Sequence, residues 1–112
     1  MRVDVRFHGI ERSGALAEYA TRRVHQHLSR FGGQVRGVSL RLSDENGPRG
    51  GNDKRCQIAA KGRDIGTLHL SQTQADLYAG VDVALARFAH VIGRALERAR
   101  TRPAVAGARH RS

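Results

Sequence analysis

The chain has 112 residues, with 20 lysine or arginine side chains against 10 aspartate or glutamate and a formal net charge of +10. This length suits one domain with its own core. No apolar run approaches the roughly 18 residues of a membrane helix, and the N-terminus lacks the apolar segment of a signal peptide. The single cysteine, Cys56, excludes an internal disulfide. We therefore expect a cytoplasmic protein.

The first half of the chain predicts a strand, a helix and a second strand. Residues 2–8 alternate apolar and polar side chains, as a half-buried strand does. Ser13 is the expected N-cap of a helix that Gly32-Gly33 ends. The apolar stripe of that helix recurs every three or four residues and comprises Leu16, Ala20, Val24, Leu28 and Phe31. A second strand is expected over 35–42, and the turn-forming residues 43–53 predict a long flexible loop.

The second half predicts two more strands and a long helix. Strands are expected over 54–61 and 65–72, joined by a turn at residues 62–64. The helix runs from Asp76 to Arg100 before Pro103, with an apolar stripe of Leu77, Val81, Leu85, Phe88, Ile92, Leu96 and Ala99. Residues 1–102 should form the domain, and 103–112 a basic, disordered tail. The order β-α-β-β-β-α predicts an α+β fold, a four-stranded sheet with two helices packed on one face and the other face open to water.

Charge is concentrated in arginine, which provides 18 of the 20 basic residues. Its planar guanidinium binds phosphate in a bidentate manner, so nucleic acid is favoured over a membrane or an acidic protein. At 100° per residue each predicted helix gathers cations on its solvent face, and two neighbouring helices would merge them into one basic groove. A solvated helix face is the simpler alternative, but the basic stripe of the second helix has no acidic partner before Glu97. The predicted RNA-binding residues are Arg22, Arg23, Arg30, Arg87, His90, Arg94 and Arg98.

The open face of the sheet is also basic, with Arg2, Arg6, Arg41 and Arg55 at outward positions. Such charges are ordinary guards against edge-to-edge pairing of sheets. No row of aromatic side chains is expected there, which favours binding through phosphates and shape over base stacking.

Catalytic or metal chemistry is not expected, and neither is a cofactor or a small-molecule substrate. His25 and His27 are two residues apart on a helix and point in nearly opposite directions, so they cannot share a metal. Cys56 falls on an inward strand position and is expected to be a small buried side chain. Asp76 and Asp82 are expected to be a helix-start charge and a helix-surface residue.

Residues 76–82, Asp-Leu-Tyr-Ala-Gly-Val-Asp, resemble the D-[ML]-Y-A-x-[IV]-D start of the second helix in a known family. This family comprises the short ribosome hibernation promoting factors and ribosome-associated translation inhibitors, often called sigma-54 modulation proteins. Leu68-His69-x-Ser71 and Ala15-Leu16-x-Glu18-Tyr19 are weaker matches in the same order, and the resemblance covers residues 1 to about 100.

The resemblance implies binding to ribosomal RNA in the decoding region of the small ribosomal subunit, across the path of messenger RNA and tRNA. We expect the chain to be a monomer. Arg87 and Arg94 match basic positions of the family's second helix, and Arg22 and Arg23 fall in the basic part of the first. His90 stands where the family usually has Arg or Lys, and Leu96 where it often has Lys.

Three alternatives remain open from the sequence. The first is a general module for structured RNA or DNA that shares only the fold. The second is a protein-interaction module whose positive charge is incidental. The third, a nuclease, lacks any pair of groups spaced for acid-base chemistry.

Overall fold

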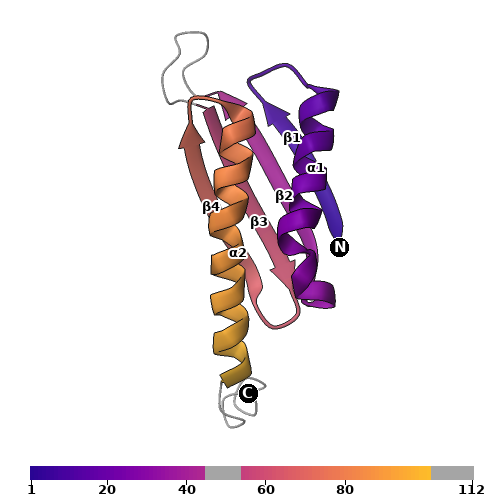
Figure 1. Ribbon diagram of the computed structural model, residues 1–112, viewed down its shortest axis with the longest axis vertical. Coiled ribbons are helices and arrows are strands. Elements are labelled where there is room, and N and C mark those ends of the chain that lie inside the picture. The colour runs from indigo at the N-terminus through magenta and orange to yellow at the C-terminus, as the bar shows by residue number, and fades with distance from the viewer. Residues whose placement is uncertain (45–53, 102–112) are drawn as a thin grey trace.

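The computed structural model describes residues 1–44 and 54–101, which form one four-stranded sheet covered by two helices (Figure 1). The elements in chain order are β1 (Arg2–His8), α1 (Gly14–Leu28), the 3-10 segment η1 (Ser29–Gln34), β2 (Val35–Asp44), β3 (Lys54–Gly62), β4 (Gly66–Gln74) and α2 (Leu77–Thr101). The strands lie in the order β1-β2-β3-β4, with β1 parallel to β2 and the other two pairings antiparallel. The predicted α+β fold and its element order are confirmed.

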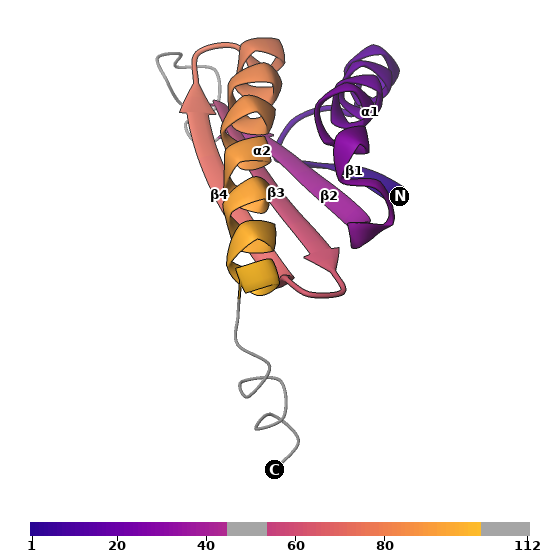
Figure 2. The ribbon, with the colours of Figure 1, turned by 60° about the horizontal axis from the view of Figure 1, so that its bottom comes forward.

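Both helices cover the same face of the sheet, α1 toward β1 and α2 toward β3 and β4 (Figure 2). The strand register explains why this face is apolar. One row across the sheet consists of Val5, Leu40, Ile58 and Leu70, and the neighbouring row on the opposite face consists of Asp4, Ser39, Ala59 and His69. Because side chains alternate along a strand, the same register that buries one row exposes the next.

The core contains the helix stripes read from the sequence. Leu16, Ala20, Val24 and Leu28 of α1 are buried, as are the α2 side chains Val81, Leu85, Phe88, Ile92 and Leu96. Three end residues of the predicted stripes differ, since Phe31, Leu77 and Ala99 are only half-buried. Within the described residues, neither helix is long and apolar enough to cross a membrane.

The helix starts are set by side-chain caps. The Ser13 hydroxyl accepts a hydrogen bond from the Leu16 backbone N–H at 3.1 Å, which confirms it as the N-cap of α1. A carboxylate oxygen of Asp76 accepts one from the Ala79 N–H at 3.0 Å, so this residue caps α2 in addition to providing a helix-start charge.

Several predicted boundaries are wrong by one to three residues. The α-helix ends at Leu28, and the chain continues through Phe31 as the 3-10 segment, in which Gly32 adopts the left-handed φ of 59°. Strand β2 extends to Asp44, so it includes two residues that were predicted to lie in the loop. The Asp44 carboxylate pairs with Lys54 of the neighbouring strand at 3.2 Å. The rest of that loop, residues 45–53, and the predicted tail, residues 103–112, lie outside the described residues.

Candidate nucleic-acid interface

Helix α2 carries a stripe of exposed basic residues, defined here as Arg87, His90, Arg94 and Arg98. Their spacing of three, four and four residues follows the helical period, so all four lie on one side of α2. Within residues 1–44 and 54–101, His90, Arg94 and Arg98 form no ion pair. The α2 stripe is therefore a solvated cationic surface, as predicted from the sequence.

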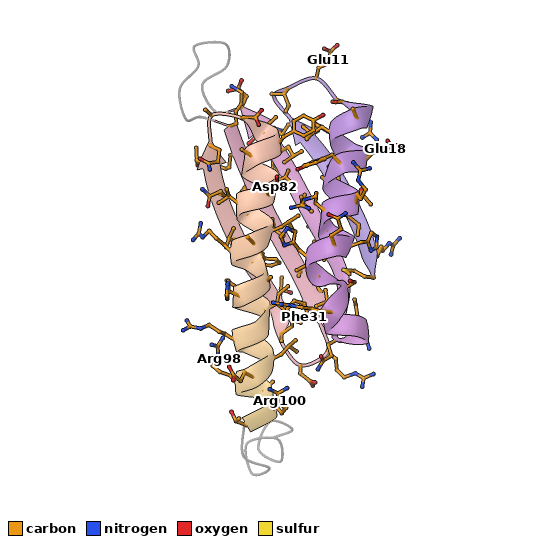
Figure 3. The ribbon with its side chains drawn as sticks, in the orientation of Figure 1. Glu11, Glu18, Phe31, Asp82, Arg98 and Arg100 are labelled. Atoms are coloured by element: carbon orange, nitrogen blue, oxygen red, sulfur yellow. The ribbon has the colours of Figure 1, made fainter. Side chains whose placement is uncertain are left out.

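The α2 stripe faces away from α1. Arg87 donates a hydrogen bond to the side-chain carbonyl of Gln72 in β4, the edge strand on the far side of α2. At 100° per residue the four side chains lie about 80–160° around the helix from Asp82, which faces α1. Figure 3 shows Asp82 between the two helices and Arg98 on the side of α2 away from α1.

The seam between α1 and α2 is occupied by a polar cluster that the sequence analysis missed, defined here as the seam cluster Tyr19, Arg23, His27 and Asp82. The Tyr19 hydroxyl donates to one oxygen of Asp82 at 2.7 Å, and the Arg23 Nε donates to the other at 2.8 Å. Arg23 also contacts Gln26 at 2.6 Å and the His27 ring at 3.1 Å. Asp82 is thus a link between the helices, and its prediction as a plain helix-surface residue is wrong.

The seam cluster alters the ionisation of its members. Burial raises the pKa of the Asp82 carboxyl, but the hydrogen bonds from Tyr19 and Arg23, together with the Arg23 charge, outweigh it and the pKa is lowered. The hydrogen bond to Asp82 raises the pKa of the Tyr19 hydroxyl. Burial and the neighbouring Arg23 charge lower the pKa of His27. Asp82 is therefore ionised and His27 neutral at pH 7.

The three basic residues predicted on the first helix differ in how far their charges are exposed to solvent. Arg22 is exposed and lies over the Tyr19 ring, with its guanidinium carbon 5.9 Å from the ring centroid. Arg30 is exposed in η1 and lies over Phe31 at 4.9 Å. Arg23 is half-buried, with 31% of its side chain exposed and its charge matched by Asp82. Arg22 and Arg30 present cations to solvent, whereas Arg23 is tied into the helix seam.

The predicted single groove between the helices is therefore wrong. The seam holds a neutralised Arg23–Asp82 pair, and the exposed contact residues predicted on the helices lie on two sides of it, Arg22 and Arg30 on α1 and η1 and the α2 stripe on the outer side of α2. The sequence carried a partial signal, because Asp82 directly follows the buried Val81 and so lies at the edge of the apolar stripe. The relative placement of two helices, which decides whether Asp82 meets Arg23, is not contained in either helix alone.

The described residues offer few candidates for metal binding or for thiol chemistry. In residues 1–44 and 54–101, no group of three His, Cys, Asp or Glu side chains could hold a metal ion. Cys56 is fully buried, and burial raises the pKa of its thiol to about 12, so the thiolate is scarce at pH 7. The arrangement is suited to binding an anionic partner electrostatically.

Comparison with known structures supports this fold. The N-terminal domain of Protein Y from Thermus thermophilus superposes with a TM-score of 0.67 at 22% identity, covering 84% of this chain and 98% of that one. A ribosomal subunit interface protein from Coxiella burnetii superposes with a TM-score of 0.70 at 16% identity, covering 84% and 96%. Both likenesses show the fold alone. Comparison with curated protein sequences finds no match.

Comparison with protein families gives a match over nearly the whole chain. The family described as sigma 54 modulation protein / S30EA ribosomal protein matches residues 3–100, which include every helix and strand described above apart from the ends of β1 and α2. The resemblance read from residues 76–82 is confirmed, and the chain belongs to this family.

Proposed function

We propose that the chain is a ribosome hibernation and translation-inhibition factor that binds the small ribosomal subunit in its decoding region. It blocks messenger RNA and tRNA by occupying their path, and it acts as a monomer in the cytoplasm. The observation that carries the proposal is the exposed α2 stripe of a chain in this family, where His90, Arg94 and Arg98 form no ion pair with any other described residue. Repelling cations held on one rigid helix face are stabilised by an anionic partner, and ribosomal RNA offers a dense array of phosphates.

The predicted contact residues are proposed to have three different roles. Arg22, Arg30, His90, Arg94 and Arg98 are exposed and are proposed to contact RNA directly. Arg87 is exposed but hydrogen-bonded to Gln72, which holds its guanidinium on the β4 side of α2. Arg23 is proposed to act as a positioning residue, because its charge is matched by Asp82 in the seam cluster.

Ribosome co-sedimentation with a footprint on the RNA tests the site. Contact with four to six phosphates should give a log-log slope of binding against salt of roughly −3 to −5. Arg94→Ala with Arg98→Ala should abolish co-sedimentation. Arg12→Ala with Arg63→Ala, which removes the same charge from two exposed loop positions, should leave it intact. Equal effects of the two pairs would show that only net charge matters.

In vitro translation tests the mechanism. Inhibition by the protein should weaken as messenger RNA and initiator tRNA are raised, because competing ligands displace one another by mass action. The ribosomal RNA should remain intact on a gel. Inhibition that is indifferent to both ligands would contradict occupancy of the decoding region, and cleaved RNA would revive the nuclease alternative.

A further inference from the structure

The face of the sheet opposite the helices is a second basic surface. Its regular outward strand positions carry Arg2, Arg6, Arg41, Arg55 and Lys61 against one carboxylate, Asp4, and Arg36 at the irregularity of β2 lines the same face. Asp4 pairs with Arg6 at 2.7 Å, and both side chains are largely exposed. Within the part of the chain that the structure describes, Arg2, Arg41 and Lys61 are exposed and form no ion pair.

The floor between these cations is made mainly of short side chains, with Gln57 and His69 at two further outward positions. Two adjoining shallow hollows share Asp4, Arg6, Ser39 and Ala59, and together they extend along the strands from Arg41 toward Lys61. The outward residues along this trough include Gly37, Ser39, Ala59, Thr67 and Ser71. Four residues of strand separate the Arg41 row from the Arg2 row, a length of about 13 Å. Short hydroxyl side chains between long cations allow a phosphate backbone to approach and give it hydrogen-bond donors.

Protection of the sheet edges does not account for this charge. Guard residues are required on edge strands, where unpaired backbone groups could pair with another sheet. Arg41 lies on β2 and Lys61 on β3, the two central strands, whose backbones are paired on both sides. Cations on central strands repel their neighbours without protecting any edge.

We propose that this trough, defined by Arg2, Arg41, Lys61, Ser39 and Ala59, is a second RNA-binding surface, so that the domain holds one RNA segment on its helices and another on its sheet. The inference rests on RNA being the partner under the proposed function, and it adds a contact on the opposite side of the domain. The described outward strand positions include no Phe, Tyr or Trp, and their rings are the imidazoles of His8 and His69. Without a row of large aromatic side chains, the trough is suited to the sugar-phosphate backbone of double-helical RNA and not to a run of stacked, unpaired bases.

Stoichiometry tests the second surface. The full chain is titrated with a short RNA duplex of fixed sequence at low salt and analysed by sedimentation velocity. The wild-type chain should bind two duplexes. Arg41→Gln with Lys61→Gln should bind one, with the log-log salt slope reduced in magnitude by about 1.8 for two lost phosphate contacts. Arg94→Gln with Arg98→Gln, on α2, should also bind one duplex, and the four-fold variant should bind none.

A matched control separates position from net charge. Arg12→Gln with Arg63→Gln removes two charges from exposed positions outside both surfaces and should still bind two duplexes. If the sheet variant behaves like this control, the second surface is refuted while the proposed function stands. If the α2 variant behaves like the control in ribosome co-sedimentation, the proposed function fails instead.

Two further arms complete the test. Should Arg41→Gln with Lys61→Gln fail to fold, Ser39→Asp places a carboxylate on the trough floor and should likewise leave one duplex bound, because Ser39 is exposed.

An acidic protein is the alternative occupant of the trough. If poly-glutamate binds the trough more tightly than the duplex, and the sheet variant loses that binding, the assignment to RNA is overturned.

Discussion

The Asp82→Asn substitution should destabilise the domain by weakening the seam between its helices. Asparagine keeps the shape of aspartate and has similar helix propensity, so the change removes a charge and little else. In the native chain the carboxylate accepts hydrogen bonds from Tyr19 at 2.7 Å and Arg23 at 2.8 Å. Asparagine can still accept from Tyr19 through its single oxygen, but it offers Arg23 no charge.

The expected magnitude follows from exposure. Hydrogen bonds to charged groups contribute about 1.5–3 kcal/mol when well buried, and exposed ion pairs about 0.2–1 kcal/mol. The Asp82 and Arg23 side chains are 38% and 31% exposed, so water replaces part of what is lost. We expect a loss of about 1 kcal/mol in the free energy of unfolding, or about 4 °C in Tm for a domain of this size.

The dependence of this loss on pH identifies its cause. The folded-state pKa of Asp82 lies below its unfolded value, so its contribution is fully present above the unfolded pKa of about 4 and is lost as pH falls through the folded pKa. Urea unfolding of both chains should therefore show a difference near pH 7 that shrinks below pH 4. A difference that stays constant down to pH 2 would refute the electrostatic origin.

A double-mutant cycle isolates the link between the helices. Tyr19→Phe alone should cost about 1 kcal/mol, because it removes one hydrogen bond to a partly exposed carboxylate. In the Asp82→Ala background the same change should cost much less, which gives a coupling energy of about 1 kcal/mol between the two positions. Strictly additive effects would mean that the contact between Tyr19 and Asp82 contributes nothing to stability.

Three further predictions concern the core and the helix start. Phe88→Ala should cost about 3–5 kcal/mol in urea unfolding because the ring is fully buried, and a cost below 1 kcal/mol would contradict this packing. Cys56 should resist maleimide labelling in the folded chain and react in urea, since its thiol is buried with a pKa near 12, and rapid native labelling would place it at the surface. Ser13→Ala should cost about 1 kcal/mol by removing the α1 cap, while Ser29→Ala, whose side chain caps no helix, should change little.

The fold was predictable because each of its elements is encoded locally. Strict alternation identified the strands, and apolar residues at every third or fourth position identified the helices. The parallel pairing of β1 with β2 follows once a helix connects them and returns the chain to the same end of the sheet. The errors fall at element ends, as at Ser43 and Asp44, where polar residues typical of loops are held in a strand by pairing with Arg55 and Lys54.

The candidate site was only partly predictable, because it depends on relations between elements. Solvent exposure of Arg94 and Arg98 follows from the period of one helix, and the structure agrees. The pairing of Arg23 with Asp82 spans 59 residues of sequence and depends on how far α1 is rotated and shifted along α2. No spacing within either helix contains that information. Arg23 was therefore predicted to be an unpaired cation, whereas the structure pairs it with Asp82.

The seam cluster also explains how two helices with so much positive charge can pack side by side. An unmatched Arg23 would face the like charges of α1 and η1 at close range, and the packing of the helices would oppose its solvation. Asp82 matches that charge at 2.8 Å, and Tyr19 satisfies the second carboxylate oxygen, so the contact between the helices carries little net charge. The repulsion that remains is distributed over exposed strips on either side of the seam, where water and salt screen it in the free protein. Under the proposed function, RNA phosphates would replace that screening when the chain binds, and the release of counterions would favour the complex most strongly at low salt.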